Sequence, residues 1–235
     1  MNKEIVVGFL LEHGEECCND SISRHIREKR KCTFCLDVNR DTSLLISHMG
    51  EARKTIDVGL ALAPSSTLAH YLPYQTAGFK LFFQHGENES EQILNVLKEV
   101  FSRGYDRAVI LSHSVPNLPV DYIEMAVDYL RKGTDLVMGP LENGMFYLVG
   151  IARDTFERLL PLDVFRTFAF VDGSAFEETL GVFKSHSLKP RFLPKWYVVK
   201  SIEDLRKVCE DSSLGRGRKT KWIGGTIEDL SDIMR

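Results

Sequence analysis

The sequence predicts an α/β protein with a three-layer, mostly parallel sheet. Two observations lead to this prediction. Short apolar runs of strand length alternate with segments of helical periodicity, from the run at residues 5–11 to the run at residues 146–151. Most of these runs are continuous rather than alternating, as expected for strands covered by helices on both faces. With 235 residues, the chain is best explained by one α/β domain.

The first half of the predicted sheet consists of apolar runs that end at polar turns. These runs are residues 5–11, 58–63, 79–83 and 108–111. Residues 90–103 place apolar side chains three and four positions apart, which predicts an amphipathic helix with Gly104 as its C-cap. Hydroxyl residues before position 68 favour a short helix at residues 67–72. The patterns are weaker in three segments: residues 17–31 have weak helical spacing, residues 32–36 fit an apolar strand, and residues 43–54 fit a helix or a strand–helix transition.

The second half continues the alternation. Helices are expected at residues 120–132, 154–160 and 174–186, and strands at residues 136–138, 146–151 and 191–193. Ser201 can cap a further helix, with Asp204 at its third position. From residue 209 the chain contains glycines and the basic residues Arg216, Arg218, Lys219 and Lys221, and it ends in a short predicted helix at residues 227–234. We therefore expect a domain at residues 1–208 and a C-terminal arm at residues 209–235, with the basic run exposed to solvent or meeting an anion or a partner.

Composition and charge narrow the function. The formal net charge of −3 argues against nucleic acid as a partner held by bulk electrostatics. No apolar run approaches the roughly 18 residues that a membrane span needs. The first apolar run is short, is flanked by charges and lacks a small-residue cleavage site, so we interpret it as a strand and expect a cytoplasmic protein. The odd count of five cysteines favours reduced thiols.

Two polar loops follow predicted strands. One contains Ser112, His113 and Ser114, and the other contains Glu142, Asn143 and Gly144. In α/β sheets the loops at the carboxyl ends of the strands line the ligand crevice. We therefore expect any ligand site to be at these two loops.

Several stretches, in order and spacing, resemble a known family. They are FFQHG at residues 82–86, FSRGYDRAVILSHSVPNLP at 101–119, TDLVMGPLENGMFYLVGI at 134–151, EETL at 177–180 and VKSIEDL at 199–205. From about residue 60 to residue 208 the chain resembles the bacterial and archaeal glycosyltransferases of the nucleotide-diphospho-sugar transferase (GT-A, Rossmann-like) fold, the radical-SAM/selenodomain-associated type. The resemblance implies that fold, with a nucleotide sugar or a related phosphate-containing small molecule as partner.

The polar residues of the chain depart from the family pattern. Ser114 and Asn143 stand where the family has aspartates, and Val198 and Lys200 stand where it has two further acids. The Gly-rich loop expected after the first strand is not recognisable, and the segment after Gly86 is the acidic GENESEQI. Enzymes of this fold use a carboxylate to hold a divalent cation, and neutral oxygens do not supply its charge. The residues therefore do not support a metal cofactor, and the cofactor stays undetermined.

Each candidate residue has a functional and a structural interpretation. His113, with Ser112 and Ser114, could donate to a phosphate, ligate a metal or act as a general acid or base, or it could be a surface residue of an altered site. Lys200 could bind phosphate in place of a metal, or it could be an exposed lysine at a strand end. Gln84 could contact ligand or cap backbone groups. The implied substrate contacts are Gln84, Ser112, Ser114, Glu142, Asn143, Gly144 and Lys200, where Glu142 is either a shifted acid or a solvated loop residue.

The N-terminal cysteines suggest a second kind of site. Cys32 and Cys35 have the spacing of half a zinc site, and either Cys17 and Cys18 or His13 and His25 could supply the other half. Adjacent cysteines seldom converge on one ion, and Cys35 fits equally well as a buried apolar residue.

Three hypotheses follow. The chain is a transferase acting on a nucleotide sugar, or a catalytically degraded relative that binds a ligand or a protein, or an interaction module stabilised by zinc.

Overall fold

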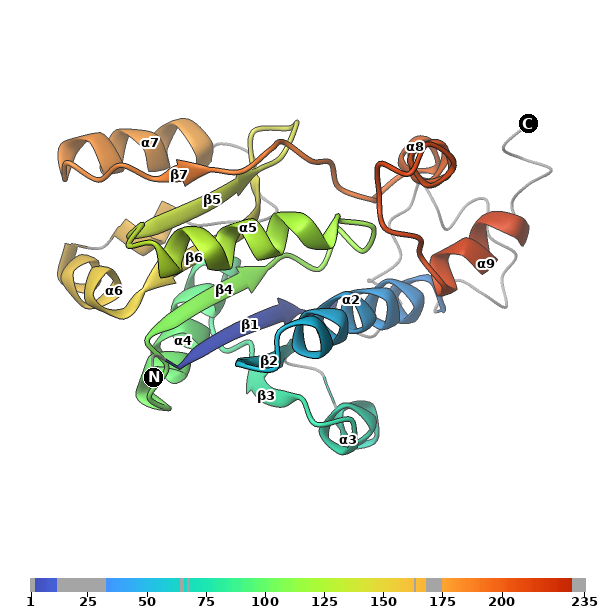
Figure 1. Cartoon of the computed structure of the whole chain (residues 1–235), viewed down its shortest axis with the longest axis horizontal. Helices are drawn as coiled ribbons and strands as arrows, with labels where there is room; N and C mark the ends of the chain where they lie inside the picture. Colours follow the sequence, from blue (N-terminus) through green and yellow to red (C-terminus); the bar gives the residue numbers. More distant parts are fainter. Residues whose placement is uncertain are drawn as a thin grey trace.

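Seven strands of the described residues form one sheet in the order β3-β2-β1-β4-β6-β5-β7 (Figure 1). The structure is a computed structural model, and it describes residues 3–11, 33–63, 66, 68–162, 164–167 and 175–229. The strands are β1 Glu4–Phe9, β2 Ile56–Leu62, β3 Lys80–Phe83, β4 Arg107–Leu111, β5 Leu136–Pro140, β6 Phe146–Ala152 and β7 Arg191–Phe192. All seven lie at or within two residues of their predicted positions, so the apolar runs did specify strands.

The sheet is mostly parallel, as predicted. β1 pairs in parallel with β2 and β4, β2 with β3, and β5 with β7. β6 is the exception, because it lies between β4 and β5 and is antiparallel to both. The predicted crossover from β4 through the helix to β5 therefore spans one intervening strand. This arrangement places the loop after β4 and the β5–β6 hairpin at the same edge of the sheet.

Helices cover both faces of the sheet, which gives the three layers (Figure 1). They are α2 Thr33–Ala52, α3 Leu68–Thr76, α4 Glu89–Ser102, α5 Val120–Arg131, α6 Arg153–Leu159, α7 Ala175–Ser185, α8 Ile202–Ser213 and α9 Trp222–Asp229, with 3₁₀ turns η3 Leu160–Leu162 and η4 Val164–Thr167. In β1, Val6 joins the core on the α2 and α5 face, whereas Ile5 and Val7 join the core on the α4 and α6 face. Gly8 lets α2 approach β1 closely, since a Cβ there would lie 3.0 Å from Ile46 Cγ1.

The prediction for the start of α2 was wrong, because it gave a strand where the structure has a helix, and it also missed the full length of this helix. Residues 32–36 were expected to form a strand, but α2 begins at Thr33 and continues to Ala52. Phe34, Val38, Leu45 and Met49 are all buried, and their spacing of four and seven residues follows one face of a helix. The local run of apolar residues hid this longer period.

The expected boundary at residue 208 falls inside α8, which continues through Ser213. The predicted capping box is present, since Ser201 Oγ accepts from the Asp204 backbone N–H at 3.1 Å and Asp204 Oδ2 accepts from the Ser201 backbone N–H at 2.8 Å. The last described helix, α9, begins at Trp222 rather than at residue 227. Residues beyond 229 lie outside the described part of the chain.

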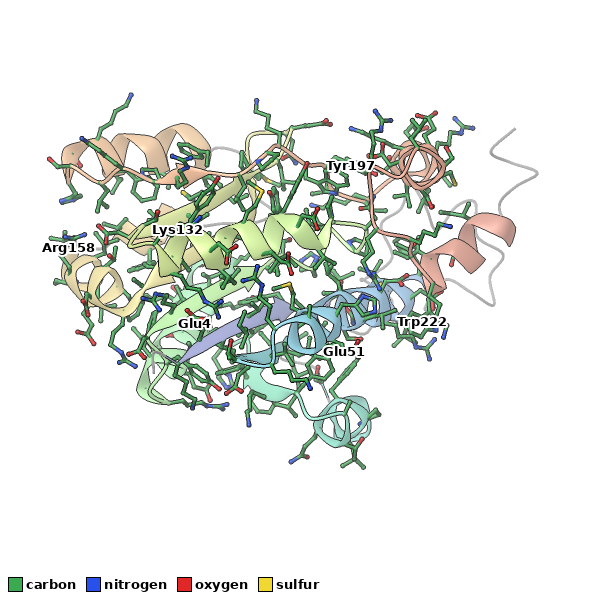
Figure 2. All side chains as sticks on the ribbon, viewed as in Figure 1. Glu4, Glu51, Lys132, Arg158, Tyr197 and Trp222 are labelled. Atoms are coloured by element: carbon green, nitrogen blue, oxygen red, sulfur yellow. The ribbon has the colours of Figure 1, made fainter. Side chains whose placement is uncertain are left out.

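The segment expected to be an arm is docked on the domain. Asp41, fully buried in α2, accepts hydrogen bonds from the backbone N–H groups of Lys221, Trp222 and Ile223 at 2.7, 3.1 and 2.9 Å. The backbone N–H of Arg218 donates to the Asn117 carbonyl at 2.9 Å. The basic run is therefore attached through Arg218 to the loop that follows β4. Trp222 lies at the same end of the molecule as Tyr197, beyond the carboxyl ends of the strands (Figure 2).

A buried ion cluster closes the opposite end of the sheet. Glu4, at the start of β1, is 5% exposed and accepts from Arg131 at 2.6 and 2.8 Å and from Arg107 at 3.0 Å. Glu4 lies far from Tyr197 and Trp222 (Figure 2). The two ends of the strands thus differ, with a closed charge cluster at the amino ends and polar loops at the carboxyl ends. In the described residues no helix has both the length and the apolar character needed to cross a membrane.

Candidate functional site

The loop after β4 holds three predicted site residues in one small cluster. The Ser112 backbone N–H donates to the Tyr147 carbonyl at 2.9 Å, which fixes the loop to β6. Ser112 and Ser114 are buried, and His113 is partly exposed. Ser114 Oγ lies 2.6 Å from His113 Nδ1, so the hydroxyl and the imidazole share a hydrogen bond. This bond orients the ring and leaves its Nε2 as the group that can meet a ligand.

His113 is neutral at physiological pH. Burial lowers the pKa of its imidazole from 6.5 to about 4, and the positive charge of Lys200 lowers it further in the same direction. A neutral imidazole can donate one hydrogen bond and accept another. The residue therefore offers this edge of the sheet a polar group without a charge.

The lowered pKa of His113 predicts a pH-dependent stability. A folded-state pKa below the unfolded value gives stabilisation that is complete above pH 6.5 and is lost as the pH falls toward 4. We expect the free energy of unfolding of the wild type, measured in urea, to fall by up to about 3 kcal/mol over this range relative to that of His113→Asn. The amide oxygen of the asparagine can replace Nδ1. Asp37 and Asp41, whose pKa values are raised by burial, shift stability in the opposite direction in both proteins and cancel in the comparison. Parallel pH profiles would contradict the assignment.

Lys200 lies beside this cluster. The backbone N–H of the preceding residue, Val199, donates to the Ser114 carbonyl at 2.9 Å, and the following residue, Ser201, caps α8. Lys200 is half-buried, and its charge is felt at His113. The structure therefore brings together Ser112, His113, Ser114 and Lys200, from two segments that are about 90 residues apart in the sequence.

The second predicted loop lies at the same edge, but its side chains are engaged elsewhere. Glu142 Oε2 accepts from Lys207 Nζ at 2.7 Å, so the carboxylate is paired with α8. Asn143 Oδ1 accepts from the Met145 backbone N–H at 3.3 Å within the hairpin. Gly144 has a φ of 82°, which a side chain would strain. Contact of these three residues with a ligand stays a prediction.

Gln84 follows β3 and is buried. Its Nε2 donates to the Leu10 and Ala61 carbonyls at 2.9 and 2.8 Å, so the side chain caps the backbone where β1 and β2 end. The capping role expected for this residue is present. Its contact with a ligand also stays a prediction.

The described residues at this edge do not form a site for a divalent cation. In the ranges that the structure describes, no three His, Cys, Asp or Glu side chains come together in a way that could hold a metal ion. The Ser114 hydroxyl is hydrogen-bonded to His113, and the Asn143 amide oxygen is bonded within its own hairpin. The two neutral oxygens that stand where acids were expected are thus used within the protein.

The cysteine predictions are only partly covered. Cys17, Cys18 and Cys32 lie outside the described residues. Cys35 is buried in α2 and is disulfide-bonded, so its sulfur is not a thiolate ligand in this structure. The expectation of reduced thiols is therefore wrong for Cys35, whereas it holds for Cys209, which is free.

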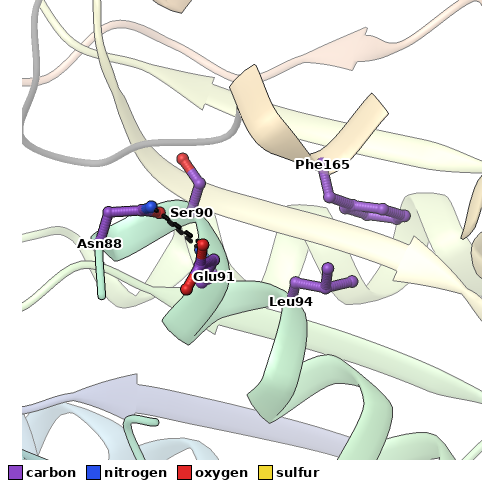
Figure 3. Close-up of a pocket in the computed structure, with 5 residues that line it drawn as sticks. All are labelled: Asn88, Ser90, Glu91, Leu94 and Phe165. Atoms are coloured by element: carbon purple, nitrogen blue, oxygen red, sulfur yellow. Dashed lines mark hydrogen bonds between the residues drawn. The ribbon is translucent and has the colours of Figure 1, made fainter. Parts of the chain in front are cut away.

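A hollow that the sequence did not indicate lies at the start of α4. It has a volume of 370 Å³ and is lined by Asn88, Ser90, Glu91, Leu94 and Phe165 (Figure 3). Glu91 is held by its own turn, because its carboxylate accepts from the Glu87 backbone N–H at 2.9 Å and from Asn88 Nδ2 at 3.2 Å. The only signal in the sequence was the acidic stretch after Gly86, which departs from the family pattern.

The fold is that of the nucleotide-diphospho-sugar transferases. A structure from Desulfovibrio desulfuricans G20, provisionally named as such a transferase, matches 100% of this chain and 99% of its own with a TM-score of 0.75 and 19% identity. A cytidylyltransferase from Leptospira borgpetersenii serovar Hardjo-bovis (strain JB197) matches 100% of this chain and 97% of its own, with a TM-score of 0.54 and 10% identity. A CMP:2-keto-3-deoxy-manno-octonic acid synthetase in complex with CTP matches 91% of this chain and 100% of its own, with a TM-score of 0.50 and 11% identity.

The family follows from the sequence itself. Residues 48–170, more than half of the chain, match the model of a family described as "Uncharacterized protein conserved in bacteria (DUF2064)". The chain belongs to this family. A search among curated proteins found no match. The resemblance predicted from the sequence motifs is confirmed for the fold.

Proposed function

We propose that this protein binds a nucleotide sugar, or a related nucleotide carrying phosphates, across the carboxyl ends of its central strands, and that it transfers the sugar to an acceptor. The observation that supports this most directly is the cluster of Ser112, His113, Ser114 and Lys200 at that edge. In α/β sheets ligands bind at this edge, and the synthetase of the same fold was crystallised with CTP.

The proposed roles follow from the positions of these groups. Ser112, His113 and Ser114 line the diphosphate region, and Asn143 and Gly144 are near the sugar. His113 is the candidate general acid or base, because its neutral imidazole can exchange a proton at Nε2 while Nδ1 is held by Ser114. Gln84 and Glu142 border the same edge from either side.

A second function is favoured by the altered polar residues. Ser114 and Asn143 carry no charge, and both side chains are hydrogen-bonded within the protein. A relative that has lost sugar transfer but still binds a nucleotide or a protein partner would look like this. The two functions require the same fold, but only the first includes turnover of a nucleotide sugar.

Thermal unfolding with a panel of nucleotides and nucleotide sugars tests the proposal. We expect at least one cytidine, uridine or guanosine nucleotide at millimolar concentration to raise the Tm. Release of free sugar or nucleoside diphosphate from that ligand would support transfer, and binding without turnover would support the second function. If no nucleotide in the panel changes the Tm or gives turnover, nucleotide binding is refuted.

A further inference from the structure

Lys200 is held in place on both sides of its position in the chain. The Val199 N–H donates to the Ser114 carbonyl, and the Lys200 N–H donates to Asp204 Oδ2 at 2.9 Å. These two bonds fix the backbone of Lys200 between the loop after β4 and the start of α8. A lysine on a free surface loop would not be held in this way.

Lys200 forms no ion pair in the part of the chain that the structure describes. No carboxylate there lies within 4.0 Å of its ammonium nitrogen. Of the nearest candidates, Asp204 uses one oxygen to cap α8, and Glu142 is paired with Lys207. Glu89 acts on Lys200 only at longer range. A half-buried charge without a partner costs free energy, which a bound anion would recover.

The electrostatics of the surroundings agree with an anion. Burial lowers the pKa of Lys200, although the carboxylates of Glu89 and Asp204 act in the opposite direction. The positive charge of Lys200 acts on the neutral imidazole of His113, which shares a hydrogen bond with the Ser114 hydroxyl. In either tautomer of His113 this pair keeps one donor for an anion, the Nε2–H or the Ser114 hydroxyl. The N-terminus of α8 adds the positive end of a helix dipole.

We propose that Lys200, with His113 and Ser114, binds the diphosphate of the nucleotide directly and that no divalent cation is needed for binding. The proposal rests on the nucleotide-binding function proposed above. The ammonium group supplies the positive charge that a metal ion would otherwise bring to the phosphate oxygens. The ligand class is a nucleoside diphosphate or its sugar ester, and inorganic pyrophosphate is its minimal form.

Calorimetric titrations with CTP, with a nucleotide sugar and with inorganic pyrophosphate test this, each in EDTA and in Mg²⁺. We expect the affinities to differ by less than about threefold between EDTA and Mg²⁺, and Lys200→Gln to weaken each by at least about tenfold. Lys189→Gln is the matched control, since this exposed lysine precedes β7 at the opposite edge of the sheet. The ligand-free Tm of Lys200→Gln should equal or exceed that of the wild type, because a desolvated charge is removed.

The outcomes separate this inference from the proposed function. Binding that requires Mg²⁺, or that survives in Lys200→Gln, would overturn the role of Lys200 and leave nucleotide binding intact. Pyrophosphate binding through Lys200 without binding of any nucleotide would support the anion site and refute the proposed function. The absence of binding by all three probes would overturn both.

Discussion

Replacing Glu4 with glutamine is expected to lower the free energy of unfolding by about 3 kcal/mol, because it removes one partner of a buried ion cluster. The Glu4 side chain is 7% exposed and forms ion pairs with Arg107 and Arg131, of which Arg107 is itself only 19% exposed. Loss of the carboxylate leaves two guanidinium groups close together without their shared counter-charge. Urea unfolding at pH 7 measures the loss.

Glu99→Gln is the matched control for the Glu4 exchange. Glu99 also pairs with an arginine, Arg103, at 2.5 Å, but both side chains are more than a third exposed. Its loss should cost no more than about 0.5 kcal/mol. If the two variants lose similar amounts, the charge cluster at the amino ends of the strands does not stabilise the sheet.

Replacing Asp41 with alanine is expected to cost about 3 kcal/mol and to release α9 from α2. The Asp41 carboxylate is the acceptor for three successive backbone N–H groups, those of Lys221, Trp222 and Ile223. Without it these donors lose a charged acceptor at the start of a helix, and each unsatisfied buried donor costs about 1 kcal/mol or more. Urea unfolding measures the total loss, and amide hydrogen exchange at residues 221–223 shows whether it is local.

Two variants bracket the Asp41 result. Asp41→Asn keeps one oxygen acceptor without its charge and should lose about half as much. Asp154→Ala removes an exposed carboxylate from the first turn of α6, where no side chain caps the helix, and should lose about 0.5 kcal/mol. Unchanged exchange at residues 221–223 in Asp41→Ala would show that α9 is held by other contacts.

The sheet was predictable because its strands are short apolar runs with clear ends, and α4 because its buried residues repeat every three or four positions. The antiparallel direction of β6 was not predicted, although the short loop between Pro140 and Phe146 cannot form the long crossover that parallel strands need. The start of α2 was missed for a different reason. Cys35 and its apolar neighbours look like a strand until positions as far away as Met49 are counted.

The position of the candidate site was predictable, but the ion-pair partners of its residues were not. Ser112, His113 and Ser114 follow a strand, and the carboxyl ends of parallel strands share one edge of the sheet. Nothing local shows that Glu142 is paired with Lys207, or that Lys200 forms no ion pair within the described residues. Such pairings depend on how α8 packs, which is set by contacts between segments distant in sequence. The docking of residues 211–223 was missed for the same reason, because glycines and basic residues are also typical of free arms.

The docking of α9 has a consequence for how the protein is made. Asp41 and Asn117 are buried polar residues whose partners include backbone groups of residues 218–223. During synthesis these two residues emerge from the ribosome well before those partners exist. The first half of the sheet can pair early, yet the loop beside the candidate site gains its final hydrogen bonds only when α9 arrives. The candidate site is therefore the last part of the domain to be completed, and a chain truncated before residue 218 should carry a formed sheet and an unfinished candidate site.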